Sequence, residues 1–277
     1  MAISGGIKFF KQSKCLFVKD ASATATSNNS VAKNLLTSNR FVRWVSSGSN
    51  DTTTETITIT MPSATIDRLF LVDINLKEFT VKYDVSGTAT NFSNITGLSG
   101  SKSTISETGY SKDTAYYEFD AVTTTKIYIT ATKTQVANEE KSIERVYVTE
   151  ELGTFEGYPQ VSKEELVSNI NKTKVLSGNL NVQKRLEVFQ CSLSFKNYPA
   201  IQNDYDILLS LNRRVDSFLI WLCGGKDGNN FSIDRENWKL KNIYNVQVIS
   251  SLPIKWNKGI YIAGFNGKIK LQQATEV

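Results

Sequence analysis

The sequence predicts a mostly β protein, and three neighbouring stretches carry that prediction. The segment Glu55–Met61 alternates apolar and polar residues, with its isoleucines on one face, which is typical of a half-buried strand. The run Leu69–Val72 is apolar throughout, which suits a strand buried on both faces. The segment Phe79–Tyr83 alternates again. Three strand patterns in close succession predict the middle of a β-sandwich.

More strand patterns follow, and then a boundary. Strands are predicted over Tyr116–Asp120, Lys126–Thr132 and Ser142–Thr149. The segment Gly153–Pro159 then combines two glycines with a proline, and most of the chain's excess positive charge lies beyond it. At 277 residues the chain is long enough for two domains. We therefore predict domains over residues 1–158 and 159–277, separable by limited proteolysis between them.

The second domain is predicted to be a β-sandwich-like fold with one helix. Asn203 or Asp204 is placed to cap the helix, and Arg213 and Arg214 suit its last turn. Its apolar stripe consists of Ile207, Leu208 and Leu211. Around it we predict strands over Leu186–Phe195, with the face of Phe189, Cys191, Leu193 and Phe195 toward the core, and over Ser217–Cys223.

Trp44 lies beside a polar loop and permits two interpretations. Arg40 and Arg43 flank it and Asp51 lies in the loop that follows, so these three residues are the candidates for ligand binding. The other interpretation is that Trp44 fills the end of the sandwich core while the arginines are solvated or stack on its ring. We favour the second, since a buried tryptophan is common in sandwich cores.

The residue inventory argues against catalysis. The chain has no histidine, which excludes Ser-His-Asp and Cys-His nucleophilic sites and histidine-ligated zinc. No phosphate-binding glycine motif is present, and no carboxylate pair lies in an aromatic cleft pattern. Its three cysteines are far apart and predict free thiols in a reducing compartment. We therefore predict no enzyme activity, no catalytic or metal-binding residues and no cofactor.

The order of these pieces resembles the galactose-binding-like jelly roll of discoidin domains and carbohydrate-binding modules. The resemblance is carried by Arg43 and Trp44, Thr56–Met61, Ile66–Leu71 and Phe79–Tyr83, and it covers roughly the first 150 residues. It implies a jelly-roll β-sandwich. In those families an Asp-Gly pair before the tryptophan helps to hold a structural calcium. Here Leu36 and Thr37 stand in its place, so we predict no calcium site.

The whole chain resembles structural proteins of tailed-bacteriophage particles, in which a discoidin-like module precedes a tail-type β domain with one helix. This implies a subunit of the tail, tail-adaptor or baseplate region, made in the host cytoplasm, which contacts other virion proteins and copies of itself in a ring. The alternative is a carbohydrate-binding or host-adhesion module. We expect neither a membrane segment nor a signal peptide. Direct nucleic-acid contact is not expected either, because the lysines of the basic second half are interleaved along strands.

The N-terminal segment Ile7–Lys14 mixes lysines with Phe9 and Phe10. One interpretation is an assembly arm that docks on the first sandwich or on an adjacent subunit, with the two phenylalanines as anchors. The other is a plain first strand of the jelly roll. The first predicts that a chain lacking residues 1–14 stays folded but does not assemble.

Overall fold

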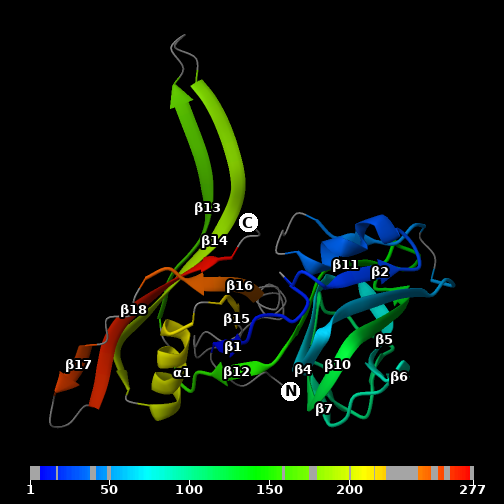
Figure 1. Ribbon diagram of the computed structural model, residues 1–277, viewed down its shortest axis with the longest axis horizontal. Coiled ribbons are helices and arrows are strands. Elements are labelled where there is room, and N and C mark those ends of the chain that lie inside the picture. Colours follow the sequence, from blue (N-terminus) through cyan, green and yellow to red (C-terminus); the bar gives the residue numbers. More distant parts are fainter. Residues whose placement is uncertain are drawn as a thin grey trace.

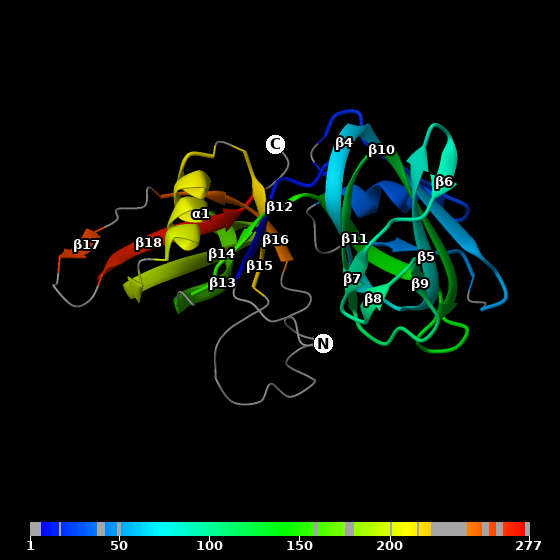
Figure 2. The same cartoon turned by 90° about the horizontal axis from the view of Figure 1, so that it is seen from below.

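A computed structural model describes residues 7–16, 18–37, 42–48, 51–157, 160–174, 180–199, 201–214, 216–222, 243–250, 255–258 and 263–274. Two β-sheets dominate the fold and lie side by side (Figures 1 and 2). The predicted class, mostly β with a jelly-roll-like sandwich and a second β unit with one α-helix, is confirmed. Within the described residues, no helix is long and apolar enough to span a membrane.

Sheet B, the first sandwich, has ten strands. The central order is β3-β11-β4-β10-β5-β6, with β2 beside β4, β7 beside β10, β8 beside β7, and β9 beside β5. Their bounds are β2 Ser22–Ala25, β3 Trp44–Val45, β4 Glu55–Ile74, β5 Leu76–Val85, β6 Thr88–Thr90, β7 Ile95–Gly97, β8 Gly100–Lys102, β9 Ile105–Glu107, β10 Thr114–Thr134 and β11 Ser142–Thr149. A short 3-10 helix, η1 (Asn29–Leu36), lies between β2 and β3 in the sequence.

Two long strands, β4 and β10, run through both layers of this sandwich. The first part of β4 pairs with β2 and with the end of β10, and its second part pairs with β11 and the start of β10. Irregular register near Glu118–Val122 and Thr124–Lys126 separates the two parts of β10. The same two strands therefore build one layer before the irregularity and the other after it.

The core between the layers is the one that the apolar alternation predicts. Ile57 and Ile59 are fully buried there, and Leu69 and Leu71 enter the same cluster from the other layer. Trp44 is fully buried in this core and its indole N–H donates to the Ser27 carbonyl at 3.1 Å. The interpretation of Trp44 as a core residue is thus confirmed.

Sheet A, the second unit, has eight strands in the order β12-β1-β15-β16-β18-β14-β13, with β17 also beside β18. Their bounds are β1 Lys8–Phe10, β12 Glu151–Thr154, β13 Gln160–Lys174, β14 Leu180–Pro199, β15 Phe218–Trp221, β16 Ile243–Val248, β17 Lys255–Lys258 and β18 Ala263–Gln273. The N-terminal segment thus contributes a strand to the second sheet, and sheet B is built from residues between β1 and β12.

The helix α1 (Gln202–Asn212) packs on one face of sheet A through the predicted stripe of Ile207, Leu208 and Leu211. The predicted cap is wrong, because Ile201 occupies the N-cap position and makes no side-chain cap. Asp204 is fully buried and instead holds the segment between β12 and β13. Its carboxylate accepts the backbone N–H groups of Glu156 at 2.8 Å and Gly157 at 2.9 Å, together with the Tyr198 hydroxyl.

The other face of sheet A packs on the outer face of sheet B. Phe10, Trp221 and Ile243 from sheet A meet Phe70 and Tyr147 from sheet B in one buried cluster. The Phe70 ring contacts Phe10 edge-on at 5.0 Å and Trp221 edge-on at 5.4 Å between ring centroids. We call this contact the joint; its members are Phe10, Leu16, Phe70, Val72, Leu98, Tyr116, Tyr147, Leu219, Trp221 and Ile243.

The strands β13 and β14 form an antiparallel hairpin that extends away from the rest of the molecule (Figure 1). The strand β14 pairs with β18 from Gln190 to Pro199. Beyond that stretch, residues 167–174 and 180–188 pair with each other and with no further described strand. We call these two segments the outer arm.

Candidate functional site

The ligand candidates predicted around Trp44 do not form one site. Arg40 lies outside the described residues. Arg43 is exposed and its guanidinium donates to the Asp73 carboxylate at 3.2 Å. Asp51 accepts both the backbone N–H and the hydroxyl of Thr134 at 3.1 Å, and the backbone hydrogen bond from Thr134 lowers the pKa of its carboxyl. Each described residue ties a loop to a strand, which is a structural role.

Phe9 and Phe10 are both fully buried inside the chain. Strand alternation sends Phe9 into the α1 side of sheet A, where its ring lies 4.6 Å from Phe155, and Phe10 into the joint. They have no surface left for an adjacent subunit. The segment is therefore not a strand of the jelly roll but a strand of the second sheet, paired with β12 and β15. The expected docking on the first sandwich is found for Phe10, which contacts Phe70 and Tyr116 there, whereas Phe9 packs inside the second unit.

Charged residues border the joint and are matched with one another. Lys8 donates to the Glu118 carboxylate at 3.0 Å, and the Tyr116 hydroxyl donates to the same carboxylate at 2.6 Å. Burial opposes ionisation of Glu118, but these two hydrogen bonds outweigh it and lower the pKa of its carboxyl. Arg68 pairs with Glu151 across the same border. These groups fasten sheet A to sheet B and leave no reactive carboxylate there.

A second buried carboxylate, Glu107, is similarly occupied. It accepts from the Tyr117 hydroxyl at 2.8 Å, the Ser99 hydroxyl at 2.9 Å and the Lys102 ammonium at 2.8 Å. A carboxylate with three donors holds the surrounding turns in place. The described residues contain no cluster of three His, Cys, Asp or Glu able to hold a metal ion.

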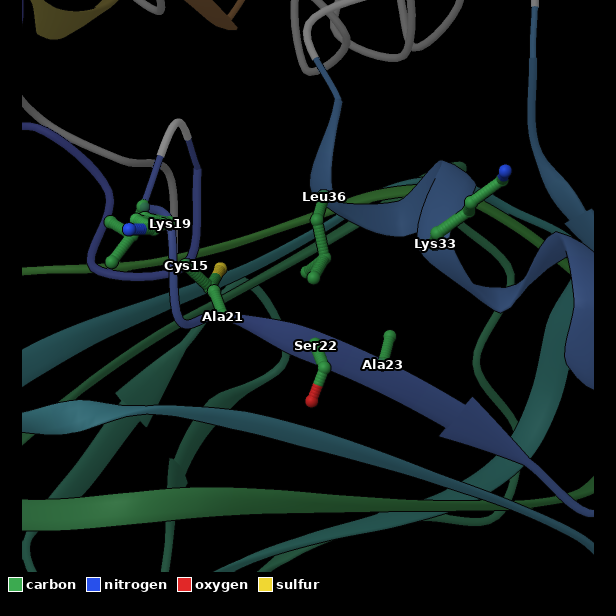
Figure 3. A pocket seen from close by; sticks show the side chains of 8 residues that line it. Cys15, Lys19, Ala21, Ser22, Ala23, Lys33 and Leu36 are labelled. Carbon is green, nitrogen blue, oxygen red and sulfur yellow. The ribbon is translucent and has the colours of Figure 1, made fainter.

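An open depression of about 460 Å³ lies between β2 and η1 at the edge of the first sandwich (Figure 3). Leu36 and Cys15 point into it, and Lys33 reaches outward. Burial raises the pKa of the Cys15 thiol to about 11, so the thiolate needed for nucleophilic chemistry is absent near neutral pH. The described lining has no aromatic ring and no carboxylate. It therefore lacks the usual features of a sugar or catalytic site.

Contacts within the described chain do not account for the stability of the outer arm. An isolated two-stranded hairpin is marginally stable in water. Residues 167–174, the eight residues that β13 contributes to the arm, correspond to roughly 26 Å of strand. The strand β13 is also the edge of sheet A, so one row of its backbone N–H and C=O groups has no strand beside it in the described chain. An edge of this kind is a template for a strand from another chain.

The sequence patterns did not predict this arm. The segment Ser162–Glu165 matches a helix capping box, and the residues after it mix lysine, asparagine and serine with isolated apolar residues. A signal was nevertheless present, because Lys172–Lys174 and Leu180–Val182 enclose a short stretch that contains Ser177, Gly178 and Asn179, which is typical of a hairpin turn.

Comparisons with known proteins give structural neighbours and no sequence family. No protein-family model matches the chain, and no curated protein matches it. A chitosan-binding module of a chitosanase/glucanase from Paenibacillus sp. IK-5 matches with 19% identity and a TM-score of 0.38, over 50% of this chain and 98% of the module. A module from Clostridium perfringens, solved with GalNAc-beta-1,3-galactose, matches with 16% identity and a TM-score of 0.36, over 46% of this chain and 94% of the module.

A fucosidase from Ruminococcus gnavus matches with 15% identity and a TM-score of 0.37, over 49% of this chain and 26% of the enzyme. The neighbours thus include carbohydrate-binding modules with jelly-roll-like folds, each matched over about half of this chain. With TM-scores below 0.5, they carry no argument about what this chain binds. They also give no support to a bacteriophage origin.

Proposed function

We propose that this chain is a non-catalytic structural subunit that assembles with copies of itself through the outer arm. The observation that carries the proposal is the pairing pattern of β13 and β14, which leaves seven register pairs, from Val167–Val188 to Lys174–Leu180, without a further strand beside them in the described chain. A neighbouring copy that packs against the arm, or adds a strand to the edge of β13, supplies the missing contacts.

The rest of the described molecule supports this proposal because the apolar faces of sheet A are covered within the chain. One face packs on sheet B and the other on α1, and the buried carboxylates Glu107 and Asp204, like the partly buried Glu118, all have donors. The finer proposal places the subunit in the tail, tail-adaptor or baseplate region of a tailed-bacteriophage particle, with other virion proteins as further partners. It rests on the resemblance seen in the sequence, and electron microscopy of purified virions tests it by the presence or absence of a repeating collar of this chain.

A shortened arm tests the assembly role. Leu166 and Phe189 face each other in the register, so residues 167–188 are replaced by Asn-Gly, a pair that closes two-residue hairpins. Phe189 is kept because its ring stacks on Tyr244 in the core, at 3.5 Å between centroids. Light scattering is expected to show concentration-dependent oligomers for the full chain and monomers for the shortened one, at equal thermal stability. A full chain that stays monomeric at high concentration contradicts the proposal.

A second candidate is a carbohydrate-binding or adhesion module. The observation that favours it is the outer face of the layer of sheet B that lies away from the joint. Hydroxyl side chains form rows across neighbouring strands there, because Thr24 pairs with Thr58, and Thr56 and Thr80 both pair with Thr130. Such hydroxyl groups both donate and accept hydrogen bonds, as sugars do. Binding to a glycan array, removed by Thr58→Lys on this face, would support the second candidate; an array without binding would leave the first.

A further inference from the structure

A notch of about 380 Å³ lies where the two sheets adjoin. Three segments line it: the crossing segment with Lys11 and Lys14, the middle of β4 with Ser63, and the turn after α1 with Arg214 and Asp216. Its volume lies in the range of small-molecule sites, which commonly occur where two structural units meet. Neither the assembly proposal nor the glycan alternative uses this notch.

The charged groups that line the notch differ in their ion pairs. Lys11 and Lys14 share the Glu150 carboxylate, at 2.6 and 2.9 Å. Asp216 is exposed, and it forms no ion pair with Arg214. Among the described residues, the guanidinium of Arg214 has no ion-pair partner, and its Nε–H is buried without a hydrogen-bond acceptor. A buried donor without an acceptor is destabilising, and native proteins leave few of them.

We infer that this notch binds an oxyanion, a phosphate or a carboxylate group, through Arg214. A guanidinium offers parallel N–H groups that fit two oxygens of one such group, and the ammonium groups of Lys11 and Lys14 raise the local positive potential. The ligand supplies acceptors to the guanidinium of Arg214 and joins segments that meet between the two sheets. The inference stands independently of the assembly role, because none of these residues lies on the arm.

The neighbouring Arg213 provides a matched control, since it is exposed and does not line the notch. Binding of inorganic phosphate and of acetate to the full chain is measured by calorimetry at fixed ionic strength. For the anion that binds, we expect saturable binding, weakened about tenfold or more by Arg214→Gln and unchanged by Arg213→Gln, because a hydrogen bond to a charged group contributes roughly 1.5–3 kcal/mol. Tighter binding of phosphate identifies a phosphate ligand, and tighter binding of acetate a carboxylate.

A conservative variant keeps the test informative if Arg214→Gln does not fold. Arg214→Lys retains the charge but lacks the guanidinium fork, so we expect it to bind the anion more weakly than the full chain and to retain the folded far-ultraviolet circular dichroism spectrum. The inference is overturned if neither anion binds saturably, or if Arg213→Gln weakens binding as much as Arg214→Gln does. Loss of assembly in the arm-shortened chain tests the other proposal alone, because that variant leaves the notch intact.

Discussion

The two ends of sheet A differ in what covers them. At one end, β1, β15 and β16 present Phe10, Trp221 and Ile243 to sheet B, and all three side chains are fully buried. At the other end, the outer arm of β13 and β14 leaves the body, and its two segments pair with each other alone (Figure 1). Both ends belong to one continuous sheet. The chain therefore covers one end of the sheet with its own sandwich and leaves the other end to a partner.

The path of the chain accounts for the covered end of sheet A. The first described strand belongs to sheet A, the chain then builds sheet B, and it returns to sheet A through β12. Because β1 and β12 pair, the two ends of the sandwich lie side by side at the joint. Covering this end of sheet A thus follows from the topology, whereas the topology offers nothing to cover the outer arm.

Removing the covered end is expected to have the largest effect. A chain without residues 1–14 lacks β1, which pairs on both sides, and loses the fully buried rings of Phe9 and Phe10. Each phenylalanine alone contributes about 3–5 kcal/mol, against roughly 5–15 kcal/mol for a whole domain. We expect no cooperative thermal transition by circular dichroism. A truncated chain that melts cooperatively would show that β1 is dispensable and that the segment has another role.

Two single substitutions sharpen the comparison, one in the part of sheet A that covers sheet B and one on the uncovered outer face of sheet B. Trp221 is fully buried against this sheet, 4.8 Å from the Tyr116 ring, and Trp221→Ala is expected to cost about 3–5 kcal/mol in unfolding free energy. Thr58 lies on the opposite, uncovered face, and Thr58→Ala is expected to change stability by about 0.5 kcal/mol or less. Urea unfolding measures both. Equal losses would mean that the joint contributes no more than a solvated surface.

Loss of the contacts that hold the segment between β12 and β13 is expected to have a smaller effect. Asp204→Ala leaves the backbone N–H groups of Glu156 and Gly157 without their acceptor, at a cost of roughly 2–4 kcal/mol. The same contacts should protect residues 153–157, where the sequence predicts a protease-sensitive boundary. We expect limited proteolysis to cut there in Asp204→Ala and not in the unaltered chain. Early cutting in both chains would show that Asp204 does not hold this segment.

Acidification is expected to loosen the joint slightly. Burial raises the pKa of Glu118 and Glu150, but hydrogen bonds outweigh it and lower both below the ordinary value of 4.5, so the stability they contribute at neutral pH is lost as the pH falls through their folded-state values. Asp67 acts in the opposite sense, because burial raises the pKa of its carboxyl. We expect the melting temperature to fall below about pH 4.5 and to fall less in Glu118→Gln. Identical profiles of melting temperature against pH in the two chains would show that Glu118 does not cause this loss of stability.

Sequence periodicity predicted the strands of the sandwich because each strand there has a clear inner face. The alternation in Glu55–Met61 and the continuous apolar run Leu69–Val72 differ for a physical reason. In the first, the outer residues are threonines that face solvent, and in the second Phe70 and Val72 enter the joint while Leu69 and Leu71 enter the sandwich core. The continuous apolar run therefore indicated that both faces of this segment are buried, but it did not indicate that sheet A covers the outer face.

The sequence patterns did not predict which distant strands pair with one another. Nothing local in Lys8–Phe10 indicates that its neighbours are β12 and β15, which lie more than a hundred residues away in the chain. The same limit applies to Asp204, whose position suited a helix cap but whose carboxylate binds the distant Gly157 N–H. The notch at Arg214 also depends on three segments that meet in the fold alone.

Amide hydrogen exchange as a function of protein concentration tests the central claim most directly. In dilute protein, we expect the outer arm, residues 167–174 and 180–188, to exchange rapidly, while β15 and β16 remain protected by the joint. As the concentration rises and copies assemble, protection should appear in the arm and leave the joint unchanged. An arm that is equally protected at every concentration, or one that stays unprotected in an assembled sample, would contradict the account.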